Sequence, residues 1–309
     1  MKSFLFIQIA QIFAEKCKRV ENYVECTNIE NTDRNIIYEK DICNYFVRNS
    51  TSLTELHFDS FEKIDNEKCE SVRISYWQTS LKSFSRGSLL ASSVVFDLDN
   101  ENIFALGELF RSLEDSASGT LKLRVNCNNK ELEQTQKVNA SDIKSIQSQI
   151  SELDLKQCGK VEFEDDFFDN LDNLEELSLQ FIGLKEVPSL PTSVKFLDLS
   201  FNDLRFLSWT PFSRLDNLKK LKLLGNSFYE IPTPEYQLKL IYFDLSNNRI
   251  ASLPFNVSSA FPDTVLAFMN NPLDCDLCST RDAINNALVY TRIRLLKRDS
   301  QLLENFSRK

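Results

Sequence analysis

The sequence predicts an α/β solenoid, a curved array of short repeats with a parallel β-sheet on its concave face. Three observations predict it. A spacing of apolar residues recurs from Leu174 onward, its starts at 174, 194, 218 and 240 lie 20, 24 and 22 residues apart, and an asparagine recurs at one position of the pattern. A unit of this length cannot bury its own apolar edge, so neighbouring units must stack and their strands must form one parallel sheet.

Residues 1–14 are expected to form a secretory signal peptide. Lys2 gives the segment a positive start, an apolar run follows, and Ala14 is a small residue suited to cleavage. The competing interpretation is a buried N-terminal helix. A membrane-spanning helix is not expected, because the apolar run is too short to cross a bilayer. No later stretch offers about 18 uncharged apolar residues, so we expect a released, extracellular protein without a membrane span.

Cysteine usage and glycosylation triplets agree with export. An even number of cysteines is typical of an oxidising compartment, and the possible pairings of eight number on the order of a hundred. The candidates for disulfides are Cys17, Cys26, Cys43, Cys69, Cys127, Cys158, Cys275 and Cys278. Cys17 and Cys26 lie near one end and Cys275 and Cys278 near the other, which suggests staples on the ends of the array. Asn-x-Ser/Thr triplets predict glycosylation at Asn49, Asn139, Asn256 and Asn305.

The repeats are expected over residues 51–271, weak before residue 150 and strong after it. Each reads apolar, two variable, apolar, one variable, apolar, two variable, usually Asn, one variable, apolar. The best examples are Leu174/Leu177/Leu179/Ile182/Leu184, Val194/Leu197/Leu199/Asn202/Leu204, Leu218/Leu221/Leu223/Asn226/Phe228 and Leu240/Phe243/Leu245/Asn248/Ile250, followed by the half-repeat Leu266/Phe268/Asn271. Upstream, Ile150/Leu153/Leu155/Cys158 places a cysteine at the asparagine position, and weaker matches begin near Leu53, Cys69, Ser93 and Leu121. Residues 131–148 are polar, which predicts a long, glycosylated loop.

The spacing has a direct structural meaning. Alternation at the fourth and sixth positions turns both side chains to one face of a short strand, which a helical period would not do repeatedly. The asparagines are expected to stack at the turn and to pair with buried backbone groups; they are Asn202, Asn226, Asn248 and Asn271.

These motifs resemble the extracellular leucine-rich-repeat family over roughly residues 50–278. Cys17 and Cys26, followed by Thr27-Asn28, resemble the family's N-terminal cap, and the segment from Asn271 to Cys278 is similar to the start of its C-terminal cap. The resemblance implies a cap over residues 15–50 and a C-terminal cap and tail over 272–309. The second cap departs from the family, because no cysteine follows Cys278 and the Cys-x-x-Cys spacing is one residue wider than usual. Either these two cysteines bond to each other, or the cap is abbreviated, or one of them pairs elsewhere.

Recognition of an extracellular protein or glycan ligand across the concave sheet is the predicted function. Variable residues between the apolar positions should point outward, and interfaces are enriched in aromatic side chains. The candidate contact residues are Phe181, Phe196, Asp198, Phe201, Lys220, Lys222, Tyr242 and Asp244. The structural alternative is that Asp198, Lys222 and Asp244 pair with one another and that the phenylalanines cover the edge of the core.

Other function classes are disfavoured. The formal charge of −9 argues against a nucleic-acid binder, and the single histidine, His57, leaves little for common catalytic triads or multi-histidine zinc sites. We therefore expect no enzyme activity, no cofactor and no metal. Cys275-x-x-Cys278 lacks the context of a thioredoxin-like motif. The family's immune, adhesion and guidance branches stay open, as do a matrix component and a non-catalytic accessory subunit or regulator of a separate secreted enzyme, known for some crustacean luciferases.

Overall fold

The computed structural model describes residues 17–21, 23–28, 43–50, 55–56, 69, 71–79, 83–84, 87–88, 92–98, 105–114, 119–129, 135–254 and 256–274. The expected signal peptide, His57, Cys275, Cys278 and Asn305 lie outside these residues. The chain divides into two compact units, Met1–Asn173 and Leu174–Lys309. Among the described residues, no helix is both long enough and apolar enough to cross a membrane.

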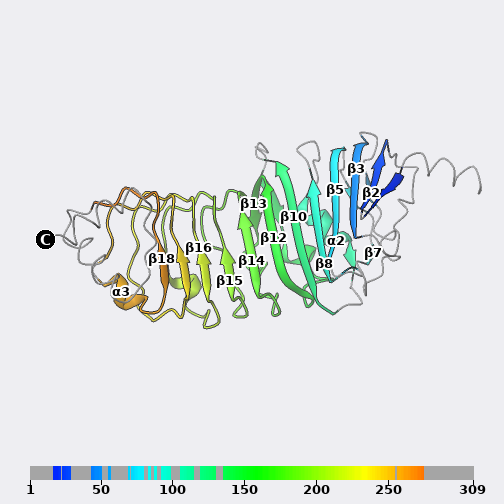
Figure 1. Ribbon diagram of the computed structural model, residues 1–309. Helices are drawn as coiled ribbons and strands as arrows, with labels where there is room; N and C mark the ends of the chain where they lie inside the picture. The colour runs from blue at the N-terminus through cyan, green and yellow to red at the C-terminus, as the bar shows by residue number, and fades with distance from the viewer. Residues whose placement is uncertain are drawn as a thin grey trace, which may run out of the picture. The chain divides into compact units, whose positions relative to one another are not determined.

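The first unit is built on a sheet of long strands (Figure 1). Its order is β1 (Cys17–Val20), β2 (Tyr23–Thr27), β3 (Asn44–Ser50), β5 (Ser71–Thr79), β8 (Ser93–Leu98), β10 (Leu121–Asn129) and β12 (Ile150–Cys158). Strands β1 and β2 are antiparallel, whereas each later neighbour in this unit is parallel. Alternate residues of these strands are buried, as a half-buried sheet requires.

Short elements form further small sheets and helices in the first unit. The parallel pairs are β4 (Glu55–Leu56) with β6 (Ser83–Phe84), β7 (Gly87–Ser88) with β9 (Leu113–Glu114), and β11 (Thr135–Val138) with β13 (Lys160–Phe163). Helix α2 (Leu106–Ser112) contacts β6, β9, β11 and the 3₁₀ helix η2 (Ala140–Asp142). Aromatic rings pack together here: Phe110, Phe167 and Phe168 are buried, and the half-buried Phe163 contacts the last two.

Two local predictions for the first unit are wrong. Residues 131–148 are not one polar loop, because β11 and η2 lie within them and Val138, Ile143 and Ile146 are buried. The weak match near Leu53 does not supply a strand of the long sheet either. Leu56 belongs to the small β4–β6 sheet, and the strand that joins the long sheet there is β3, which the predicted cap had included.

The described part of the second unit holds five short strands, β14 (Glu176–Gln180), β15 (Phe196–Asp198), β16 (Lys220–Lys222), β17 (Tyr242–Asp244) and β18 (Val265–Ala267). Each is parallel to the next, and residues that share a position in the sequence pattern are register partners. Leu177, Leu197, Leu221, Phe243 and Leu266 are paired in this way, and all are buried. The connections contain only short helices, η3 (Thr210–Phe212) and α3 (Val257–Ala260). The prediction of an α/β fold built on a parallel sheet is confirmed at this coarse level, and the described sheet is mostly parallel with few helices beside it.

The turn after each short strand is held by asparagine side chains. Asn202 accepts the N–H groups of Ile182 and Leu184 through Oδ1, at 3.1 and 3.2 Å, while its Nδ2 donates to the carbonyls of Leu179 and Leu199. The same bridging recurs at Asn226, Asn248 and Asn271. Each amide therefore satisfies buried backbone groups of its own turn and of the preceding one.

Three disulfides are present in the described part of the chain. Cys17–Cys26 closes the β1–β2 hairpin, Cys43–Cys69 joins the start of β3 to the segment before β5, and Cys127–Cys158 joins β10 to β12. All three lie in the first unit. Of the four cysteines expected to staple the ends of the array, Cys17 and Cys26 are bonded to each other, and Cys275 and Cys278 lie outside the described residues.

Candidate binding surface

The strands of the second unit present two rows of side chains on the face opposite the buried leucines, here called the outward face. The first row consists of Glu176, Phe196, Lys220, Tyr242 and Val265, which are register partners from β14 to β18. The second row consists of Ser178, Asp198, Lys222, Asp244 and Ala267. Adjacent strands lie about 4.8 Å apart, so each row is a continuous line of side chains.

The aspartates of the second row are largely buried and are bound within the fold. Asp198 Oδ1 accepts the N–H of Ser200 at 3.0 Å, and Asp244 Oδ1 accepts the N–H of Ser246 at 2.9 Å. Each carboxylate thus supplies a hydrogen-bond acceptor for a backbone N–H group just beyond the end of its strand. Both residues were predicted to contact a ligand, but their geometry assigns them a structural task.

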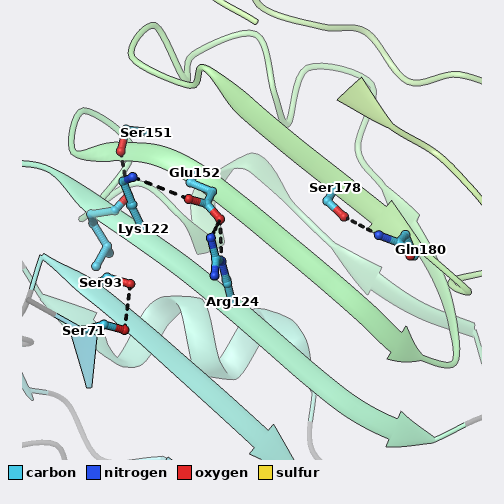
Figure 2. Close-up of polar contacts among 9 residues, drawn as sticks. Ser71, Ser93, Lys122, Arg124, Ser151, Glu152, Ser178 and Gln180 are labelled. Carbon is cyan, nitrogen blue, oxygen red and sulfur yellow. Dashed lines mark hydrogen bonds and ion pairs between the residues drawn. The ribbon is translucent and has the colours of Figure 1, made fainter. Parts of the chain in front are cut away.

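Further contacts tie the second row together. Lys222 Nζ lies 3.4 Å from Asp198 Oδ2, so the alternative of paired charges holds for these two residues, whereas Asp244 accepts from Tyr242 and Ser246. Gln180 donates to Ser178 Oγ at 3.0 Å, a contact drawn in Figure 2, and also to Asp198 Oδ2 at 3.4 Å. The second row is therefore a hydrogen-bonded and ion-paired support.

The aromatic side chains of the first row rest on this support. Lys222 Nζ lies 5.0 Å from the centroid of the Phe196 ring, within cation–π range. The Tyr242 hydroxyl donates to Asp244 Oδ2 at 2.7 Å. Both rings are half-buried, so each keeps a surface in solvent. Lys220 stands between them on β16, is exposed, and has no salt bridge among the described residues.

A second aromatic pair lies where β14 and β15 end. The rings of Phe181 and Phe201 stack with centroids 4.4 Å apart and planes inclined by 5°. Both residues have left-handed backbone, at φ 54° and 59°, an outlier for a bulky side chain. Gly225 occupies the same position in the next turn, and a Cβ there would lie 2.5 Å from the Phe201 ring. The stack therefore depends on the absence of a side chain at Gly225.

Part of the outward face of the first unit is ion-paired within itself, although the same face also exposes Trp77 on β5. Figure 2 shows the side chains of Lys122 and Arg124 converging on Glu152, a buried carboxylate on the neighbouring strand. Ser93 donates to Ser71 at 3.2 Å in the same view, and Arg73 lies 3.6 Å from Asp97 farther along the sheet. Sequence reasoning missed these pairs. The alternation of polar and apolar residues along these strands indicates an outward polar face, but which residues pair across strands follows only from the strand register.

The other predicted residues are placed as follows. Asn139 and Asn256 are exposed, and Asn49 belongs to β3. Within the residues that the structure describes, no group of three or more His, Cys, Asp or Glu side chains could hold a metal ion. Burial raises the pKa of Tyr236, whose hydroxyl donates to the Trp209 carbonyl in the connections of the second unit, away from the two rows.

No family model matches this chain, and no curated protein matches it either.

Proposed function

We propose that the chain is a secreted binding protein of the leucine-rich-repeat type, which recognises an extracellular protein or glycan on the outward face of its second unit. In this proposal the parallel strands are successive repeats of a curved array, and the outward face is its concave side. The register partners Leu197, Leu221 and Phe243, with the asparagine bridges at each turn, support the repeat assignment.

One observation carries the binding assignment. The first row displays Phe196, Lys220 and Tyr242 side by side, and the second row holds both rings in place. A side chain that is already ordered loses less conformational entropy on binding, and aromatic side chains contribute large buried areas to interfaces. The first row therefore has the properties of a contact surface, namely ordered aromatic side chains beside an exposed lysine.

Secretion is part of the proposal. Three disulfides and the absence of a membrane-crossing helix from the described residues are compatible with it. Residues 1–14 would be removed as a signal peptide, and Asn139 and Asn256, both exposed, would carry glycans.

The test is partner capture from the extracellular fluid of the source, with wild-type chain and with the Phe196→Ala/Tyr242→Ala variant. Removing two central aromatic side chains should weaken capture by about tenfold or more, since each such residue typically contributes about 1 kcal/mol or more to the free energy of binding. The matched control is Phe206→Ala/Tyr229→Ala, because those rings are exposed but lie outside both rows. Equal capture by the folded double variant and the wild type would contradict the proposal.

A further inference from the structure

The first row contains an uncompensated positive charge between two aromatic side chains. Lys220 is the register partner of Phe196 on one side and of Tyr242 on the other. It is exposed and has no salt bridge in the described part of the chain, unlike Lys222, which is bound to Asp198. An anion that reaches Lys220 therefore meets a cation that has no competing internal partner.

The charges around Lys220 limit the kind of anion that fits. Glu176 lies in the same row, and Asp198 and Asp244 lie in the second row. Three carboxylates and two lysines thus share this face. A polyanion such as a sulfated glycan would bring several negative charges to a face on which carboxylates outnumber lysines, and exposed Glu176 would repel it directly. A single carboxylate at Lys220 avoids that repulsion.

The neighbours of that carboxylate should be apolar. Phe196 and Tyr242 flank Lys220, and Val265 continues the row on β18. Their ring faces and methyl groups offer dispersion contacts and apolar burial, with no further cation for a second acid. An extended peptide alternates its side chains and can place apolar residues beside one acidic residue.

We propose that the first row binds an acidic peptide segment of a protein partner. One Asp or Glu carboxylate of the segment pairs with Lys220, and apolar side chains beside it pack on Phe196 and Tyr242. This inference rests on the proposed function and specifies the chemistry of its ligand. Lys222, Asp198 and Asp244 act as positioning residues, because they hold the two rings.

The experiment uses the full secreted chain and a library of random synthetic dodecapeptides, selected in solution and sequenced by mass spectrometry. Selected peptides should be enriched in one Asp or Glu flanked by apolar residues. The strongest peptide is then made again with that acid replaced by its amide. Lys220→Ala should weaken binding of the acidic peptide by about tenfold and leave binding of the amide peptide unchanged, because both changes remove one interaction. Lys220→Arg should retain binding, and Lys185→Ala, at an exposed lysine outside both rows, should have no effect.

Three outcomes overturn the inference: no selected peptide, a selection without acidic residues, or equal loss in Lys220→Ala for the acidic and amide peptides. A heparin hexasaccharide is the second probe. Binding of it that Lys220→Ala abolishes would replace the peptide by an anionic glycan and would also overturn the inference. The proposed function fails separately, since it requires only that capture of the natural partner depend on Phe196 and Tyr242.

Discussion

Single side chains in this protein replace backbone hydrogen bonds that short strands cannot make. Asn226 illustrates the arrangement. Its Oδ1 accepts the N–H of Leu204 at 3.1 Å, and its Nδ2 donates to the carbonyls of Leu199 and Leu223 at 3.0 and 3.1 Å. Strands of three residues leave such groups buried without a ladder partner, so the amide is part of the second unit's framework.

Asn226→Ala should lower the free energy of unfolding of the second unit by about 3 kcal/mol, because buried donors and acceptors lose their partner. Denaturant unfolding, with amide exchange over residues 174–271, measures the loss. Asn217→Ala is the control, since Asn217 is exposed and its amide donates only near the surface, to the Thr192 carbonyl. The control should change stability by about 0.5 kcal/mol or less. Similar losses in both variants would argue against the framework role.

Gly225→Ala tests whether the Phe201 ring needs the space that Gly225 leaves free. An added Cβ would lie 2.5 Å from Phe201 Cδ1 and would adopt left-handed backbone at φ 70°. Gly119→Ala has the same backbone cost at φ 73°, but nothing lies within 4 Å of its Cβ. The left-handed cost is about 1–2 kcal/mol in each variant. Gly225→Ala should lose about 1 kcal/mol more, the contribution of a displaced aromatic pair, as measured by chemical unfolding. Equal losses would mean that the ring moves without cost.

At the scale of elements, the connections of the second unit pack around Trp209. Its Nε1 donates to the Pro232 carbonyl at 2.6 Å, and its ring contacts Phe212, Phe243 and Phe261. The Tyr236 hydroxyl donates to the Trp209 carbonyl. The irregular segments between the strands are thus held mainly by contacts of the Trp209 indole and the Tyr236 hydroxyl, since they contain few helical turns.

This packing predicts an alkaline effect. Burial raises the pKa of Tyr236 above its ordinary value near 10, so the folded chain keeps a proton that the unfolded chain releases. The Tyr236 contribution is therefore constant below about pH 10 and declines as the pH rises through that value. Tyr236→Phe removes this decline. Unfolding midpoints of wild type and variant should run parallel from pH 7 to about pH 9 and converge above about pH 10. Parallel curves throughout would exclude a shifted Tyr236.

The short elements were the most predictable from sequence, and the long ones the least. In residues 174–271 the apolar spacing and the asparagines identify both strand and turn. Each position of the pattern has a single structural role, because its apolar residues face the core and its asparagine bonds the turn. In the first unit the strands run to nine residues, and β-branched or aromatic residues also occupy outward positions, such as Val95 and Phe46. Alternation alone then leaves the register open.

For the candidate surface, the sequence predicted which side chains share a face but not which of them have partners within the fold. Phe196, Lys220 and Tyr242 do lie together, since their positions in the repeat determine their register. The structural tasks of Asp198 and Asp244 depend on the N–H groups of Ser200 and Ser246, a contact that spacing does not reveal. Disulfide pairing was likewise out of reach, because it depends on which strands are neighbours.

At the scale of the whole molecule, the two units are secured by different chemistry. The first contains the disulfides Cys43–Cys69 and Cys127–Cys158, which link neighbouring strands, besides the one in its hairpin. The described part of the second relies on asparagine amides, which a reductant does not affect. Cys158 stands where the repeat pattern otherwise has asparagine, so a covalent bond replaces the amide there.

Reduction should therefore loosen the two units unequally. Loss of a native disulfide typically costs about 2–5 kcal/mol. Amide exchange in dithiothreitol should increase in residues 43–50, 71–79 and 121–158, while residues 174–271 keep their protection. The same measurement on Cys275→Ser/Cys278→Ser controls for the remaining cysteines. Simultaneous loss of protection in both units would contradict the division.

The hairpin at the start of the first unit has a consequence for growth. A stack of parallel strands invites another molecule to continue it, since each open edge offers backbone groups to an incoming strand. Here β1 runs against β2 and is covalently tied to it by Cys17–Cys26, so the place of a further parallel strand is taken. An incoming parallel strand would therefore meet a four-residue edge strand that runs in the opposite direction, which disfavours continuation of the parallel stack at this edge.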